Sequence, residues 1–134
     1  MRLHLEIVLI LSAWAAFIAT HQIFLAFDFF WLFWWADILL HTAGGALVVA
    51  SWFAVDRLQV FPRLMRLWHS HPLLVLVVMM VGWEIFEYAF GIANTTDYIS
   101  DTVQDFIFGS LGGLVVYFLN KSRTKKEGFD ILRS

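Results

Sequence analysis

Four apolar segments, each long enough to cross a lipid bilayer, fill almost the whole chain. A membrane-spanning helix needs about 20 mostly apolar residues, because the hydrocarbon core is about 30 Å thick. A backbone in lipid must satisfy its own hydrogen bonds, so segments of this length form helices. The sequence therefore predicts an all-α integral membrane protein, a four-transmembrane-helix bundle that forms one domain over residues 1–120. The predicted spans are roughly residues 5–27, 31–55, 72–93 and 100–119.

The distribution of lysine and arginine predicts the orientation of this bundle. Basic residues are concentrated in the connector between the second and third spans and in the tail, residues 121–134. The two opposite loops carry only Asp28 and Asp97. Because basic loops stay in the cytoplasm, we expect both termini and the basic tail to be cytoplasmic. The connector, residues 56–71, interleaves arginines with apolar residues, which is typical of a short amphipathic helix in the membrane interface.

Composition excludes several classes of protein. Hydrophobic residues make up 60% of the chain and charged residues 15%, whereas soluble domains carry about 25% charged residues. The chain has no cysteine, which rules out disulfides, thiolate metal sites and a cysteine nucleophile. Outside the membrane flanks, the sequence has no basic segment of the kind that binds nucleic acids. The first segment is longer than the apolar part of a signal peptide, so we interpret it as a span.

Five carboxylates lie within the predicted spans at depths where no lysine or arginine accompanies them. An acidic residue inside lipid costs at least about 2.5–3.5 kcal/mol, so it normally marks a functional site. Without a basic partner, its charge must be offset by protons, water or bound cations. The acids are Asp37, Glu84, Glu87, Asp101 and Asp105.

These acids and one histidine occur in pairs with helical spacing. Residues three or four positions apart share one face of a helix. Counted inward from a boundary near residue 30, Asp37 and His41 lie roughly 10 and 16 Å deep. All of the pairs fall in the outer half of the bundle, so we expect them to line one outward-facing pocket. The pairs are Asp37 with His41, Glu84 with Glu87, and Asp101 with Asp105.

Small residues continue the same helix faces toward the inner half of the bundle. Glycine allows helix backbones to approach closely in lipid, so we expect tight packing inward of the acids. A further histidine on the first span, His21, is expected to reach the membrane interface. The glycines that follow His41 and Asp105 are Gly44, Gly45, Gly109, Gly112 and Gly113.

The residue types in the pocket predict a divalent-metal site. Carboxylates and histidines that face one another in a four-helix bundle are the ligands of di-metal carboxylate sites. Oxygen ligands with imidazole suit Mg²⁺, Mn²⁺, Zn²⁺ or Fe²⁺, and two such ions would offset most of the negative charge. Glu84 or Glu87, if not a ligand, could serve as a general base. The predicted ligands are Asp37, His41, Glu84, Glu87, Asp101 and Asp105.

The same motifs resemble those of a known group of proteins. They are similar to small bacterial membrane proteins of the YjdF type and, more distantly, to VanZ-like proteins. The resemblance covers roughly residues 31–119 and implies a bacterial cytoplasmic (inner) membrane. The matching motifs are D-x3-H followed by two glycines, E-x2-E, and D-x3-D-x3-G-x2-G, within residues 37–45, 84–87 and 101–112.

Three kinds of function are compatible with this pocket. The leading prediction is a metal-dependent membrane hydrolase that acts on a lipid or envelope substrate. The second is a protein that binds or transports cations or protons, although a path across the membrane needs polar residues in the inner half, where Ser51 is one of few. The third is an accessory membrane subunit whose acids form a structural network or bind a partner helix. The bilayer is the expected partner in each case, and the sequence is also compatible with a homo-oligomer.

Overall fold

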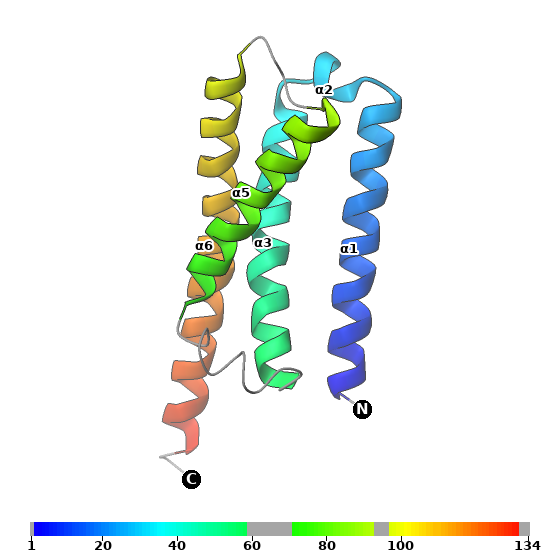
Figure 1. The fold of residues 1–134 in the computed structure, drawn as a ribbon. Coiled ribbons are helices and arrows are strands. Elements are labelled where there is room, and N and C mark those ends of the chain that lie inside the picture. Colours follow the sequence, from blue (N-terminus) through cyan, green and yellow to red (C-terminus); the bar gives the residue numbers. More distant parts are fainter. Residues whose placement is uncertain (1, 59–70, 93–96, 132–134) are drawn as a thin grey trace.

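Helices make up all the regular structure in the described part of the chain. The computed structural model describes residues 2–58, 71–92 and 97–131, and the side chains of residues 5–58, 71–92 and 97–122. Within these ranges there is no strand. The helices are α1 (Arg2–Ala26), α2 (Phe29–Leu32), α3 (Trp35–Leu58), α5 (Pro72–Phe90) and α6 (Tyr98–Ile131), as Figure 1 shows.

Four of the described helices are long and apolar enough to cross a membrane. Between 6% and 22% of the residues in each of these spans are buried inside the protein. Most of their apolar side chains therefore face outward, where lipid would surround them. The predicted all-α bundle with four apolar spans is confirmed, and the chain is a multi-pass membrane protein. The spans are Leu5–Ala26, Trp35–Leu58, Pro72–Phe90 and Tyr98–Ser122.

The second span begins later than the sequence predicts. After α1 ends, Asp28 adopts a left-handed conformation (φ 55°, ψ 29°), which aspartate tolerates better than most residues. The short helix α2 follows, and extended backbone at Phe33 (φ −132°, ψ 100°) separates it from α3. The aromatic residues of α2, Phe29, Phe30 and Trp31, thus form a separate turn at one end of the bundle (Figure 1). We call this end, where α2 lies and α6 begins, the α2 end.

The C-terminal ends of α5 and α6 differ, because α5 stops at a glycine and α6 extends far into the tail. Gly91 caps α5 with φ 67°, a conformation that favours glycine, and its backbone N–H donates to two carbonyl groups of the last turn. α6 continues without a break to Ile131, so most of the predicted tail is helical. The predicted interfacial helix falls largely on residues 59–70, which lie outside the described residues.

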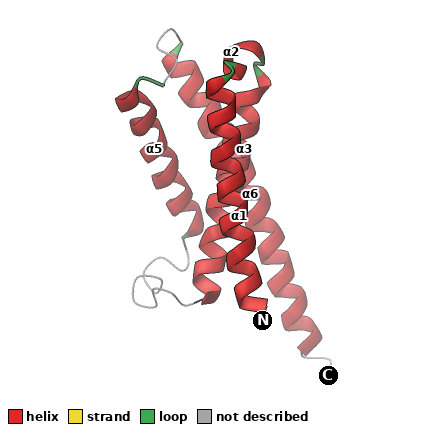
Figure 2. Cartoon of the chain, turned by 90° about the vertical axis from the view of Figure 1, so that its right-hand side faces the viewer, coloured by secondary structure: helices red, strands yellow, loops and turns green. Residues whose placement is uncertain are grey.

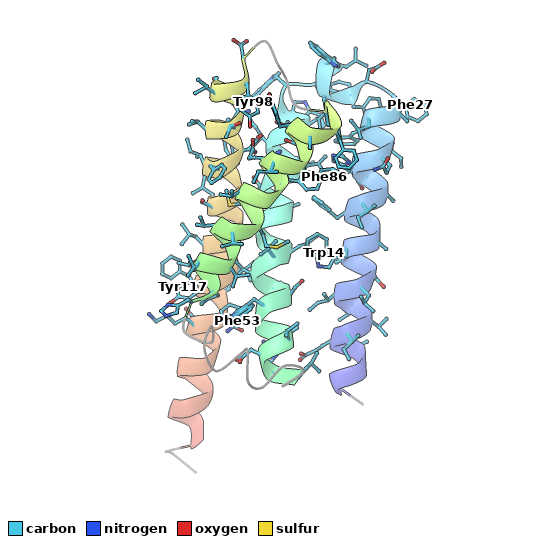
Figure 3. All side chains as sticks on the ribbon, viewed as in Figure 1. Trp14, Phe27, Phe53, Phe86, Tyr98 and Tyr117 are labelled. Atoms are coloured by element: carbon cyan, nitrogen blue, oxygen red, sulfur yellow. The ribbon has the colours of Figure 1, made fainter. Side chains whose placement is uncertain are left out.

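The helices α3 and α6 pack closely because glycines line their contact. A Cβ atom at Gly45 would overlap the backbone of Gly109, and one at Gly112 would overlap the backbone of α3. Toward the end opposite α2, Phe53 stacks on Tyr117 with ring centroids 6.3 Å apart (Figure 3). The close packing of small residues expected from the sequence is confirmed for this pair of helices.

The other two spans are arranged around α3. On one side, α1 is attached by a hydrogen bond of 2.8 Å from Trp14 Nε1 to Ser51 Oγ. Near the end opposite α2, Arg57 Nε lies 3.1 Å from Glu6 Oε2 and adds a second link between α1 and α3. On the other side, α5 lies obliquely across α3 and α6 and packs against both (Figures 1 and 2). This arrangement leaves α1 and α5 as the walls of a cavity over α3.

Candidate acidic and histidine site

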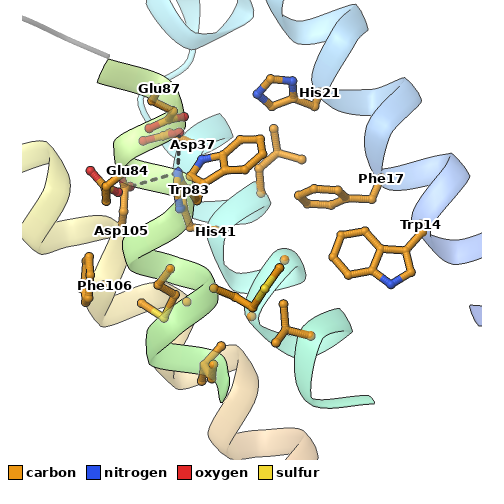
Figure 4. A pocket seen from close by; sticks show the side chains of 18 residues that line it. Trp14, Phe17, His21, Asp37, His41, Trp83, Glu84, Glu87, Asp105 and Phe106 are labelled. Carbon is orange, nitrogen blue, oxygen red and sulfur yellow. Dashed lines mark ion pairs between the residues drawn. The ribbon is translucent and has the colours of Figure 1, made fainter. Parts of the chain in front are cut away.

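His41 lies between two carboxylates that come from different helices. Asp37 precedes it by one turn on α3, and its Oδ1 lies 3.4 Å from His41 Nε2. The same nitrogen lies 3.3 Å from Oδ1 of Asp105 on α6 (Figure 4). One ring nitrogen therefore faces two carboxylate oxygens, so a proton or a cation at this point would interact with both acids.

Helix α5 completes a second group of acids. Glu84 and Glu87 are one helical turn apart and face Asp105, and the three residues each offer an oxygen within 4.8 Å of the others. The hydroxyl of Thr102 donates a hydrogen bond of 2.7 Å to Glu84 Oε2. Hydrogen bonds of this kind orient carboxylates that bind metals. Thr102 on α6 thus holds Glu84 in place across the contact between α5 and α6.

Asp105 belongs to both groups. Asp37, His41 and Asp105 also offer ligand atoms within 4.8 Å of one another. The Asp105 side chain is 3% exposed, and its Oδ1 makes no hydrogen bond within the described part of the chain, although it is close to His41. An unsatisfied buried carboxylate oxygen is energetically costly. Each of the two groups therefore has the donor types to hold a divalent cation, and Asp105 could serve as a ligand in either of them.

The site lies close to the α2 end. Asp37 and His41 are two and six residues from the start of α3, or about 3 and 9 Å along the helix axis. Asp105 lies about 10 Å from the start of α6. The first two depths are smaller than the sequence predicts, because the second span begins at Trp35 rather than near residue 30. The acids are therefore close to the level where lipid headgroups would surround the bundle.

A cavity of about 210 Å³ adjoins both groups. His21 on α1 lies at its polar end, is 7% exposed, and packs with ring centroids 5.4 Å from Trp83 and 5.8 Å from Phe30. Figure 4 shows His21 across the cavity from the acids. The rest of the lining is mostly apolar. The titratable residues that line the cavity are His21, Asp37, His41, Glu84, Glu87 and Asp105.

A comparison with known protein families places the chain in one of them. The family described as Predicted membrane protein (DUF2238) matches residues 1–126. The chain belongs to this family. The match confirms the YjdF-type resemblance and extends it over α1 and part of the tail, whereas the relation to VanZ-like proteins stays a prediction. Comparison with curated proteins and with solved structures gives no match.

In this DUF2238 protein, five of the six predicted ligands lie in the two groups. Asp101 belongs to neither group, and it lies one turn from Asp105 toward the α2 end. The expectation that His21 reaches the interface is wrong, because α1 directs this side chain into the cavity. The sequence carries a signal for this position. Trp14, Phe17 and His21 have the spacing of one helix face, and all three line the cavity.

Proposed function

We propose that this protein binds divalent cations at the acidic and histidine site. The observation that carries the proposal is the pair of ligand groups that share the buried carboxylate of Asp105. Asp37 and His41 would hold one cation with it, and Glu84 would hold the other, beside Glu87. Among the described residues, no lysine or arginine lines the cavity. Bound cations are therefore the natural counter-charge for these acids, and Mg²⁺, Mn²⁺, Zn²⁺ or Fe²⁺ suits the ligand types.

The reaction we propose for the site is hydrolysis of a phosphoester in a lipid or envelope substrate. Two divalent cations, if bound by these residues, would activate a water and stabilise the charge that develops on the attacking and leaving oxygens. The water oxygen forms a bond to phosphorus, and the bond between phosphorus and the alcohol oxygen breaks. The proton of the water passes to a glutamate and then to the leaving alcohol. Because Thr102 orients Glu84 as a ligand, Glu87 is the base in this proposal.

Transport across the membrane is a weaker alternative, judged from the part of the chain that the structure describes. A pathway would have to continue with polar groups from the site to the opposite end of the bundle. The hydroxyl of Ser51 already accepts a hydrogen bond from Trp14. Farther from the α2 end than His41, glycine contacts bring α3 and α6 together, and Val49 is fully buried. These features support a closed cation site rather than a path through one chain.

The membrane and the orientation are also part of the proposal. Four spans place the two termini on the same side, and Figure 1 shows both at the end opposite α2. Arg57 and Lys121 lie toward that end. The positive-inside rule then favours a cytoplasmic location for it, with the site facing the extracytoplasmic side of a bacterial inner membrane.

Elemental analysis of the purified protein tests the metal site. The protein is produced in cells grown with added manganese and zinc and is purified in mild detergent. Its bound metals are then compared with those of the variants Asp105→Asn, Asp37→Asn and Asp28→Asn. We expect Asp105→Asn to lose both ions, because it takes a ligand from each group, and Asp37→Asn to lose about half of the metal. Asp28, an exposed acid at the α2 end, is the matched control and should retain the metal content of the parent. Absence of metal from the parent, or full metal in Asp105→Asn, would overturn the site.

Phosphate release from vesicles of phosphatidic acid and phosphatidylcholine tests the reaction. We expect release by the parent, loss on chelation with EDTA, and at least a 100-fold loss in Glu87→Gln. The Asp28→Asn variant should keep the parent rate. A rate that survives both chelation and Glu87→Gln would contradict the proposed hydrolysis, while the metal measurement would still stand by itself.

A further inference from the structure

The cavity has two chemically different ends. Its polar end, near α2, contains the acids and His21, and the rest extends along the helices toward the middle of the bundle (Figure 4). That remaining part presents aromatic, aliphatic and thioether side chains. Bound water there would lack the two to four polar partners that ordered water needs. The apolar lining consists mainly of Trp14, Phe17, Val48, Leu76, Met79 and Met80.

The side of this cavity lies between α1 and α5. Within the described residues, α1 packs mainly against α3 and α2, while α5 packs against α3 and α6. The two walls meet at the polar end, where His21 contacts Trp83. Both helices carry exposed apolar side chains, such as Ile18 at 55% and Val78 at 55% exposure. The surroundings of the gap between α1 and α5 are therefore hydrocarbon rather than water.

We propose that this cavity binds one hydrocarbon chain of a lipid, which enters between α1 and α5, with the lipid headgroup at the acidic and histidine site. The assignment of the headgroup end rests on the proposed function, whereas the chain end rests on the apolar lining alone. The volume of about 210 Å³ is below the roughly 300–1,000 Å³ of pockets that enclose whole ligands. The cavity therefore has room for a segment of one chain, and the rest of the lipid would stay in the bilayer.

Depth and direction agree with this occupant. Asp37 and Asp105 lie about 3 and 10 Å from the starts of α3 and α6 at the α2 end, close to headgroup level. From there the apolar lining runs toward the centre of the bundle, as an acyl chain runs toward the centre of the bilayer. Met79 and Met80 are flexible side chains that can adapt to chains of different shape.

The charge of the site restricts the headgroup. Since the described residues of the lining include no lysine or arginine, the acids would repel an anionic headgroup unless divalent cations lay between them. With the cations of the proposed function bound by the two ligand groups, a phosphate headgroup would be attracted to the site rather than repelled. The substrate class is thus a lipid phosphoester, and free inorganic phosphate lacks the chain that the apolar end would bind.

Photochemical labelling tests the chain site without relying on activity. The protein is placed in nanodiscs of phosphatidylcholine that contain a few per cent phosphatidic acid with a diazirine at mid-chain. After illumination, the labelled residues are mapped by mass spectrometry. We expect Phe17 and Met80, which are half-buried in the cavity, to be labelled at least as strongly as the lipid-exposed Val78. Inorganic phosphate at millimolar concentration should leave this labelling unchanged.

Two matched substitutions make the test specific. Val48→Phe fills the apolar end about 10 Å from His41, and Val78→Phe makes the same change on the lipid-exposed face of α5. Val48→Phe should reduce labelling of Phe17 and Met80 at least fivefold, and Val78→Phe should not. Cavity labelling far below that of Val78 in the parent, or unchanged by Val48→Phe, would overturn the chain site.

The same nanodiscs, prepared with EDTA and with Mn²⁺, separate this inference from the proposed function. Cavity labelling in EDTA without phosphate release in Mn²⁺ would support the chain site and contradict the hydrolase. Phosphate release in Mn²⁺ without cavity labelling would support the hydrolase and contradict the chain site. If both proposals are correct, Mn²⁺ should increase cavity labelling by phosphatidic acid over an equally labelled phosphatidylcholine, because the cations hold the phosphate headgroup.

Discussion

Asp105 combines burial, charge and position in a way that no other residue of the site does. It is 3% exposed within a membrane span, and an ionised carboxylate there is costly unless it is compensated. His41 offers compensation on one side, and the glutamates of α5 add more negative charge on the other. A carboxylate in this setting requires protons or cations nearby. The chemistry of the whole site therefore depends on what lies between Asp105 and its neighbours.

Thr102 provides a test of whether Glu84 acts as a ligand. The substitution Thr102→Val keeps the shape of the side chain and removes the hydroxyl that donates to Glu84 Oε2. Partners that orient metal ligands typically contribute about 10–100-fold to metal affinity. We expect Mn²⁺ affinity, measured by titration calorimetry in detergent, to fall by about tenfold.

The control for this prediction is Thr42→Val. The hydroxyl of Thr42 also donates one hydrogen bond of 2.7 Å, but its acceptor is the carbonyl of Ile38 in the same helix. The chemical change is therefore the same, and the site is left intact. Equal Mn²⁺ affinities for the two variants would show that the hydroxyl of Thr102 does not support the metal ligands.

At the level of single residues, spacing predicted most of the site but not its limits. Helical periodicity placed Asp37 with His41, and Glu84 with Glu87, on common faces, and the structure brings both pairs together at Asp105. Periodicity also paired Asp101 with Asp105. It could not show that Asp101 would fall outside both ligand groups, because this depends on how α5 and α3 cross α6.

Among the helices, the contact between α3 and α6 fixes the position of the site. Gly45 and Gly109 allow the two backbones to approach closely, one helical turn after His41 and Asp105 in the sequence. An added methyl group at Gly45 would overlap the Gly109 backbone, so the helices would have to separate. Overpacking of this kind costs about 1–3 kcal/mol. We expect Gly45→Ala to lower the unfolding free energy by that amount in an SDS titration, and to weaken Mn²⁺ binding as the ligands move apart.

A second glycine in a span provides the control for that prediction. A methyl group at Gly82 on α5 would meet no atom within 4 Å. The same substitution there adds helix propensity and creates no clash, so Gly82→Ala should be neutral or slightly stabilising. A loss of stability in Gly82→Ala as large as that in Gly45→Ala would contradict the role assigned to the contact between α3 and α6.

The start of α3 shows what the sequence could not predict about the elements. The residues before it are aromatic and apolar, and such residues suit both an interfacial cluster and the first turn of a span. The break depends on two backbone conformations, left-handed at Asp28 and extended at Phe33. Neither residue type requires its conformation. The resulting shift of the helix start places the acids closer to headgroup level than the sequence indicates.

For the whole molecule, the fold was predictable because lipid leaves few choices for the backbone. Four apolar segments in a bilayer must become helices, and glycine faces indicate which of them pack closely. The cavity was not predictable in this way. It results from α1 packing on α3 while α5 lies obliquely across α6, and no local pattern fixes that angle. His21 was misassigned for the same reason, because its position depends on where α5 lies.

The orientation of the molecule is the last prediction, and α6 alone can test it. The chain has no cysteine, so a single introduced cysteine reports the location of its own position. Ser100→Cys and Thr124→Cys lie on this helix 24 residues apart, or about 36 Å, which exceeds the thickness of the hydrocarbon core. Neither substitution changes the charges that determine topology. In intact cells we expect a membrane-impermeant maleimide to label Ser100→Cys, and to label Thr124→Cys only after permeabilisation. The opposite pattern would place the acidic and histidine site toward the cytoplasm, so that any lipid phosphoester it hydrolyses would have to come from the inner leaflet.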